Sequence, residues 1–153
     1  MEQTGTFLCT HAEVDAAILT DVSTGQVHTL GSNPGIEEGD AIEGTVAPEP
    51  PMEVSWELVS VERRWQIPVE RSDETPTQLE KDLAAAQEIG ELTTRERAGI
   101  GEIHVLTVEA DQTDAAVEDV RTDQATRERA ARLGVNRVEI RANAGVVAIR
   151  YLP

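Results

Sequence analysis

The chain has very little lysine, cysteine or aromatic side chain. Lys81 is the only lysine, so the other 12 of the 13 basic residues are arginines. The single cysteine, Cys9, excludes an internal disulfide and a cysteine-based zinc ribbon, and it suits a reducing compartment. Because the aromatic residues are one Phe, two Trp and one Tyr, the core must consist mainly of Val, Ile, Leu and Ala.

Long apolar runs are missing as well. No stretch approaches the length of a membrane span. Residues 1–5 have neither the basic start nor the apolar stretch of a secretion signal. We therefore expect a cytoplasmic protein that does not associate with a membrane.

Acidic residues are what the chain has in excess. It carries 29 Asp and Glu, which gives a net charge of -16. Such self-repulsion is relieved by concentrated salt, which predicts the salt-rich cytoplasm of a halophilic archaeon. The excess is uneven, because residues 1–70 hold 13 acidic and 2 basic side chains, whereas residues 101–153 hold 9 and 7. The arginines are therefore concentrated near the C-terminal end.

The first 70 residues have the pattern of a small all-β domain. Short apolar and β-branched runs alternate with turn residues, and a bulge is expected near Leu58, where the buried face of the last strand changes. Five short strands of this kind predict a small closed barrel of the OB or SH3-like sort. The expected strands are residues 6–10, 16–22, 27–30, 41–46 and 53–61.

The remainder predicts a mixed α and β structure, so the fold class of the whole chain is α+β. Residues 71–100 are expected to be a linker and one helix, from Pro76 to Ile89, with a capping box formed by Thr75 and Gln78 and an apolar stripe that includes Leu79 and Ile89. Residues 101–153 predict a β-α-α-β-β unit. Its expected elements are a strand at 103–108, helices at 113–120 and from 122 or 123 to 133, and hairpin arms at 137–141 and 146–152.

The C-terminal hairpin has a register that the sequence constrains. Val138 and Ile140 share a face with the apolar set of the second arm only if the turn has an even number of residues. We expect the turn at residues 143–144 or 142–145. On the opposite face, Arg137 is then expected to lie across from Arg150.

The pentapeptide Thr-Arg-Glu-Arg-Ala occurs twice, at residues 94–98 and 126–130. It suggests an internal duplication, although such strings arise easily on helices, and we favour coincidence.

Two groups of residues are candidates for chemistry. Cys9 and His11 are two apart on an expected strand and so are expected to point the same way, as a thiol-imidazole pair or part of a metal site would require. We favour a structural role, with Cys9 as a small buried apolar residue. His28 and His104 occur singly within strands and are expected to be hydrogen-bonded sheet residues.

The second group is the set of C-terminal arginines. In a chain this acidic, a local surplus of Arg is a candidate surface for an anion or a nucleic acid. The alternative, which we favour, is that these arginines pair with carboxylates. The candidate residues are Arg127, Arg132, Arg137, Arg141 and Arg150.

Several segments resemble a family of uncharacterised proteins from halophilic archaea, namely residues 4–8, 33–35, 47–54, 67–71, 101–106 and 131–135. That resemblance implies no activity and transfers no catalytic residue. Residues 38–46 are similar to a short stretch common in small nucleic-acid-binding barrels.

Three functions remain open. We favour a non-catalytic binding or adaptor protein with a protein partner, and we expect no cofactor and no metal. The first alternative is a nucleic-acid-binding protein that uses the C-terminal arginines beside an OB-like barrel. The second is a small enzyme around Cys9 and His11.

Overall fold

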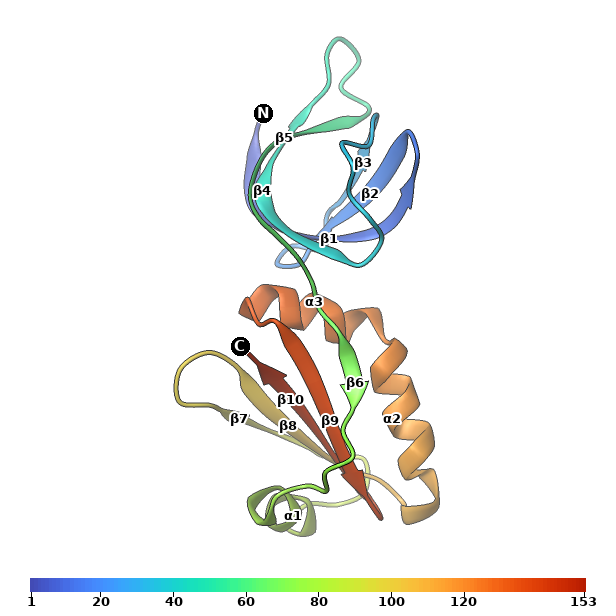
Figure 1. Ribbon diagram of the computed structural model, residues 1–153, viewed down its shortest axis with the longest axis vertical. Coiled ribbons are helices and arrows are strands. Elements are labelled where there is room, and N and C mark those ends of the chain that lie inside the picture. The colour runs from blue at the N-terminus through green and yellow to red at the C-terminus, as the bar shows by residue number, and fades with distance from the viewer. The chain divides into compact units, whose positions relative to one another are not determined.

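The computed structural model describes residues 1–153. The chain divides into two compact units, residues 1–67 and residues 68–153. Together they contain ten strands in two sheets and three α-helices (Figure 1), so the fold is of the mixed α+β kind. The segment expected as a linker and helix, residues 71–100, belongs to the second unit, where it supplies a strand at Leu92–Glu96 as well as a helix.

The first unit is a closed barrel in which the strands follow the order β1-β2-β3-β5-β4. Strand β1 pairs with both β2 and β4, and β3 meets β5 in parallel through the single residue pair Leu30 and Trp56. All five expected strands are present, most of them longer than expected. Their bounds are β1 Gln3–Glu13, β2 Ala16–Asp21, β3 Val27–Leu30, β4 Asp40–Pro48 and β5 Trp56–Gln66.

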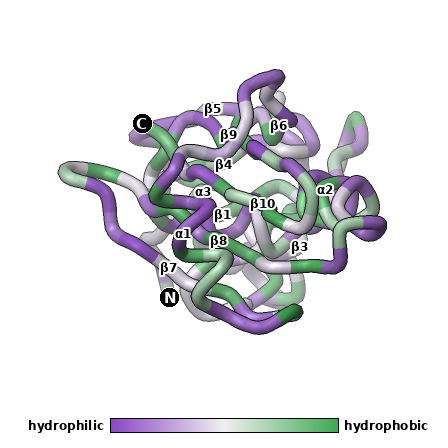
Figure 2. The backbone as a smooth tube through the Cα atoms, turned by 90° about the horizontal axis from the view of Figure 1, so that it is seen from below, coloured by the Kyte–Doolittle hydropathy of each residue, from purple (hydrophilic) through white to green (hydrophobic).

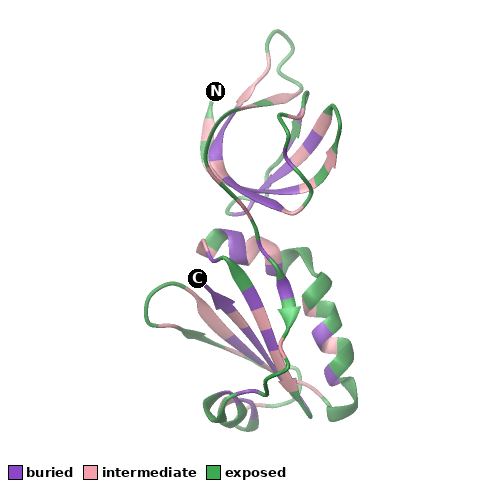
Figure 3. Ribbon diagram, in the orientation of Figure 1, coloured by how far each residue is buried: buried purple, intermediate pink, exposed green.

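Inward-facing apolar side chains fill this barrel. Phe7, Leu19 and Ile42 are fully buried, and the middle of β1 and of β4 is buried without strict alternation, since Leu8 and Ala41 are buried too (Figure 3). The expected bulge near Leu58 is present, since the β4–β5 register shifts between the pairs Thr45–Ser60 and Val46–Leu58. Gly44 is needed nearby, because a Cβ there would lie 2.3 Å from the Ser60 carbonyl oxygen.

The second unit is a five-stranded sheet of order β6-β9-β10-β8-β7 with helices on both faces. Helix α1 is connected to β8 and β10, partly through the Thr107 hydroxyl, which donates to the Ala84 carbonyl. Helix α2 packs against β6, β9 and β10 on the opposite face, and α3 follows it directly. The bounds are β6 Val69–Arg71, α1 Gln78–Ala85, β7 Leu92–Glu96, β8 Glu102–Thr107, α2 Thr113–Thr122, α3 Gln124–Leu133, β9 Arg137–Asn143 and β10 Val146–Leu152.

The helix ends follow ordinary capping chemistry. Helix α3 begins after Asp123, whose side chain accepts from the Ala125 N–H, and it ends at Gly134 with φ 74°. Helix α1 corrects our prediction, because its N-cap is Thr77 and its capping box is completed by Glu80.

The expected apolar stripe of α1 is also wrong. Leu79 and Ile89 are 54% and 62% exposed, whereas Glu80 and Ala84 are buried. The helix also ends at Ala85 rather than at Ile89, so Ile89 lies outside it.

The hairpin of β9 and β10 has a two-residue turn at Ala144 and Gly145. The turn has an even number of residues, as predicted, but it lies at a different position from either predicted turn. The resulting register brings Val138 opposite Tyr151 and Ile140 opposite Ile149. The expected pairing of two arginines is wrong: Arg150 lies opposite Glu139, and Arg137 lies opposite Leu152. The like-charge conflict is thereby avoided.

The two copies of the repeated pentapeptide adopt different structures. Residues 94–98 begin in strand β7, whereas residues 126–130 lie within helix α3. The repeat is therefore not a repeated structural unit.

Hydrophobic and hydrophilic residues alternate at short intervals along the backbone (Figure 2). None of the helices is long and apolar enough to cross a membrane.

Candidate functional site

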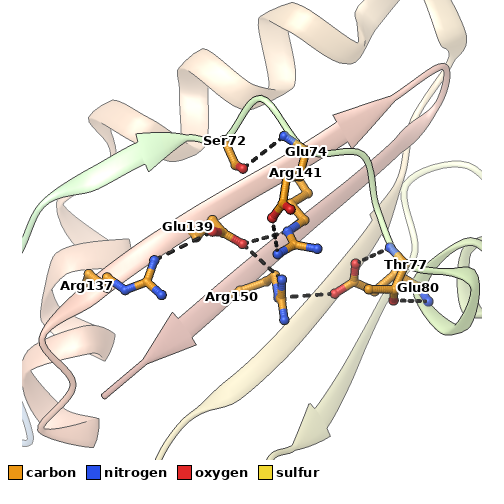
Figure 4. A network of polar contacts seen from close by, with 8 residues as sticks. All are labelled: Ser72, Glu74, Thr77, Glu80, Arg137, Glu139, Arg141 and Arg150. Carbon is orange, nitrogen blue, oxygen red and sulfur yellow. Dashed lines mark hydrogen bonds and ion pairs between the residues drawn. The ribbon is translucent and has the colours of Figure 1, made fainter.

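Three arginines of the C-terminal hairpin converge on Glu139 in β9 (Figure 4). Arg141 donates to Glu139 Oε1 at 2.6 Å and Arg150 donates to the same oxygen at 2.9 Å. Arg137 lies 3.6 Å from Oε2. Burial by itself would raise the pKa of Glu139, but the Arg141 hydrogen bond and the arginine charges lower it below its usual range. Glu139 is therefore held as a carboxylate.

Two further carboxylates complete this Arg–Glu network. Glu74 accepts from Arg141 at 2.7 Å, and the buried Glu80 lies 3.5 Å from Arg150 Nε. Glu80 comes from α1 and Glu74 from the segment before it, so the network ties both to the hairpin. Three arginines thus face three glutamates, and their positive charge is matched locally.

Strand geometry explains why these side chains meet. Residues 137, 139 and 141 alternate along β9 and so share one face of the sheet, and Arg150 joins them because it pairs with Glu139. The same face carries α1. The arrangement is a partly buried ion-pair network, whose first structural consequence is to fix α1 on the sheet.

The other two candidate arginines lie elsewhere. Arg127 and Arg132 belong to α3, whose Arg129 contacts Glu102 on the opposite face of the sheet from the Arg–Glu network. Arg127 donates to the Arg121 carbonyl at 3.3 Å, and Arg132 is exposed in the last turn. The five candidates are therefore divided between two faces, and an anion-binding role for them stays a prediction.

A second polar cluster on the α3 face confirms His104 as a hydrogen-bonded strand residue, although the sequence analysis did not identify its partners. Glu102 accepts from Arg129 at 2.6 Å and contacts His104 Nε2 at 3.2 Å. Burial lowers the pKa of His104, against the opposing effect of the Glu102 hydrogen bond. The available signal was the i, i+2 spacing of Glu102 and His104 on one strand, which puts them on the same face.

Cys9 is the small buried apolar residue that we favoured, and it does not form the alternative thiol-imidazole pair with His11. The β1–β2 register shifts between them, so an extra residue at position 10 turns the following side chains over. Cys9 is 1% exposed within the apolar barrel core, while the His11 side chain is 53% exposed and pairs with Glu13. The thiol contacts the His11 carbonyl rather than its imidazole, and burial raises the thiol pKa.

His28 is also in the barrel core, and it corrects the expectation of a hydrogen-bonded strand residue. Its ring nitrogens have no hydrogen-bond partner, and its ring contacts Phe7 and Trp56 edge-on. Burial lowers the pKa of His28, which keeps the imidazole neutral. No three His, Cys, Asp or Glu side chains come together as a metal site would require.

Comparison with known proteins gives a family match. The model of a family of unknown function, DUF5812, matches residues 3–142, a range that includes every candidate arginine except Arg150. None of the curated proteins and none of the solved structures matches the chain.

Proposed function

The chain belongs to the DUF5812 family, a family of unknown function, and on that premise we propose that it is a non-catalytic protein-binding module whose barrel binds a basic protein segment. The observation that carries the proposal is a set of exposed apolar side chains among carboxylates at one end of the barrel. We call this the loop end, and it comprises residues 13–16 and 49–55.

The loop end presents apolar side chains that the barrel does not use. Val14 is 97% exposed, Met52 75% and Val54 79%. The two loops belong to one end of the barrel, because the chain after β3 joins them: Asn33 Nδ2 donates to the Glu13 carbonyl at 2.7 Å, and the Gly31 N–H donates to the Trp56 carbonyl at 3.1 Å (Figure 1). We take these exposed apolar side chains, which lie in two loops at one end of the barrel, as the proposed binding surface.

The charge of the loop end selects the partner. Asp15 and Glu53 are exposed beside the apolar side chains, and the first Lys or Arg in the sequence is Arg63. Carboxylates repel phosphate groups, so this surface disfavours nucleic acid and favours a segment with Lys or Arg around an apolar residue.

The barrel topology supports the same location. The order β1-β2-β3-β5-β4, with β1 paired to both β2 and β4 and with β3 parallel to β5, supports our proposal that the barrel is OB-like. OB barrels bind ligands with strands 2 and 3 and with the loops β1–β2 and β4–β5, and these two loops form the loop end.

Photo-crosslinking through position 52 tests the proposal. A photoreactive amino acid replaces Met52, and covalent products formed in native cells are identified by mass spectrometry, with a second probe at Leu79 in α1 as the control. We expect a basic protein segment that crosslinks through position 52 and not through position 79. Products that are nucleic acid or acidic protein would overturn the proposal.

The identified segment then allows a quantitative test. Its synthetic peptide should bind the full chain, and the double variant Met52→Ser/Val54→Ser should weaken binding at least about tenfold, since two exposed apolar contacts are lost. The control is Leu79→Ser/Leu92→Ser, which removes two exposed apolar side chains of the second unit. Equal affinity of the two double variants would contradict the assignment of the loop end.

Nucleic-acid binding by the C-terminal arginines is the alternative, and no observation above favours it over pairing with carboxylates. It predicts that labelled single-stranded DNA or RNA binds the full chain with an affinity that falls steeply as KCl rises, and that Arg127→Ala/Arg132→Ala weakens it. The absence of binding at low salt would remove this alternative.

We also propose the salt-rich habitat of a halophilic archaeon, supported by the net charge of -16. The free energy of unfolding should rise between about 0.1 and 1 M KCl, because screening shortens from about 10 Å to about 3 Å. A free energy that is independent of KCl would contradict it. A cytoplasmic location stays a prediction from the sequence.

A further inference from the structure

We propose that the second unit binds a small monocarboxylic acid with an apolar body in a cleft beside α1, with the Lys81 ammonium as its counter-charge. The cleft is shallow and open to solvent, with a volume of about 460 Å³, so it suits a small ligand bound weakly. It does not involve the loop end, so it is independent of the barrel's partner.

Three segments of the second unit form the walls of this cleft. They are the second half of α1 with the residues that follow it, the chain just after β8, and the turn between β9 and β10. Small apolar side chains supply most of the lining: Ala84, Ala85, Ile89, Val108, Ala110 and Val146.

The walls are held in place before any ligand binds. The Gln87 side-chain amide donates to the Val105 carbonyl and to the Thr107 hydroxyl, both at about 3 Å, which fixes the end of α1 on β8. The Val108 N–H donates to the Gly145 carbonyl at 2.9 Å, and the Gly145 N–H donates to the Thr113 hydroxyl at 2.8 Å. A preformed cleft spares the ligand the cost of ordering its site.

Lys81 supplies the charge that an acid needs. It is the only lysine of the chain, and it lies in α1 at the rim of the cleft. Its ammonium forms no hydrogen bond or ion pair, although the chain carries 29 carboxylates. An exposed cation above an apolar surface matches a molecule with a carboxylate at one end and a hydrocarbon body.

Glu109 narrows the choice of ligand. Its carboxylate belongs to an exposed residue of the same cleft and is the only acidic group among the lining residues. Because Lys81 and Glu109 together give the lining no net charge, a second negative charge on the ligand gains nothing there. The apolar lining therefore selects for the hydrocarbon body, and Lys81 for a single carboxylate at its end.

A pair of matched probes tests the proposal by NMR on the full chain. The acid is 4-methylpentanoate, and 4-methylpentan-1-ol has the same carbon skeleton without the charge. We expect the acid to shift amide signals of the cleft residues, above all residues 81–89 and 108–110, with a dissociation constant of roughly millimolar. Shifts confined to other regions, or equal affinity for the alcohol, would overturn the proposal.

Two variants separate the charge from the cleft. Lys81→Gln should weaken the acid roughly three- to fivefold and leave the alcohol unchanged, since an exposed ion pair contributes little. Ala85→Leu, at an exposed lining position, should weaken both probes by occupying the cleft. The control is Arg95→Gln on β7, which removes an exposed cation outside the cleft. Equal loss for Arg95→Gln and Lys81→Gln would show a net-charge effect and refute the assignment of Lys81.

Discussion

Arg150 Nε lies 3.5 Å from Glu80 Oε2, and the two atoms form an ion pair. Neither atom has a hydrogen-bond partner. Glu80 is 1% exposed, and its other oxygen accepts from the Thr77 N–H at 2.8 Å. One side chain therefore caps α1 and binds that helix to the sheet. A carboxylate buried to this degree is tolerated only because a cation stands beside it.

Removing Glu80 should be costly. We expect Glu80→Ala to lower the free energy of unfolding by about 1–3 kcal/mol, because it removes the capping acceptor and leaves Arg150 with Glu139 as its remaining partner. Glu80→Gln should cost less, since the amide oxygen can still accept from Thr77. Urea denaturation followed by circular dichroism measures both.

The matched control is Asp82→Ala. Asp82 is an exposed acid of the same helix, hydrogen-bonded only to Gln78 four residues earlier, and its loss should cost about 0.5 kcal/mol or less. Similar costs for Glu80→Ala and Asp82→Ala would show that the ion pair with Arg150 does not hold α1.

The barrel should lose stability in mild acid because of His28. Burial lowers the His28 pKa in the folded state, with a smaller opposing effect from Asp21, whereas the unfolded chain has the ordinary value of about 6.5. The unfolded state therefore binds more protons, and the barrel's stability falls as the pH drops through about 6.5 toward the lowered pKa. Above about pH 7.5 this contribution should be constant.

Tryptophan fluorescence isolates that effect, since Trp56 and Trp65 both belong to the first unit. His28→Leu should flatten the dependence of the urea midpoint on pH, whatever its effect on absolute stability. His11→Gln changes an exposed histidine of the same barrel and should leave the slope intact. If the slope survives in His28→Leu, another group is responsible.

Gly44 and Gly5 face each other across β4 and β1, yet they should respond differently to alanine. A Cβ at Gly44 would lie 2.3 Å from the Ser60 carbonyl oxygen, whereas one at Gly5 would lie 3.3 Å from a side-chain oxygen of Asp21. We expect Gly44→Ala to cost about 1–3 kcal/mol through backbone displacement, and Gly5→Ala to cost less. Thermal unfolding measures the loss of stability in each variant. An equal loss in both would mean that the β5 backbone at Ser60 can move away from the new Cβ at no energetic cost.

The strands of the barrel could be predicted because alternation and turn residues are local signals. The same is true of the α3 caps, where Asp123 and Gly134 act on their own neighbours. The cap of α1 was misassigned because Thr75 and Thr77 both precede a residue of the right type three positions later. What decided between them was the burial of Glu80 against Arg150, a contact that local sequence does not reveal.

Tertiary contacts also determine the secondary structure of the repeated pentapeptide and the partners of the arginines. Residues 94–96 become strand β7 because they pair with β8, while the same residue types at 126–128 form helix. The Arg–Glu network depends on a register that differs from the expected one, and on Glu74 and Glu80 from a distant part of the chain. Local charge counts identified the arginines but not their partners.

Cys9 should be unreactive in the folded protein. It is 1% exposed in the barrel core, and burial raises its thiol pKa, so little thiolate forms and a reagent has no access to it. We expect no reaction with a disulfide reagent under native conditions, and reaction of one thiol per chain in concentrated guanidinium. Ser32→Cys supplies an exposed thiol in a loop of the same unit as the positive control. If native Cys9 reacted as fast as that control, the thiol would be accessible, and an enzyme that uses Cys9 would regain support.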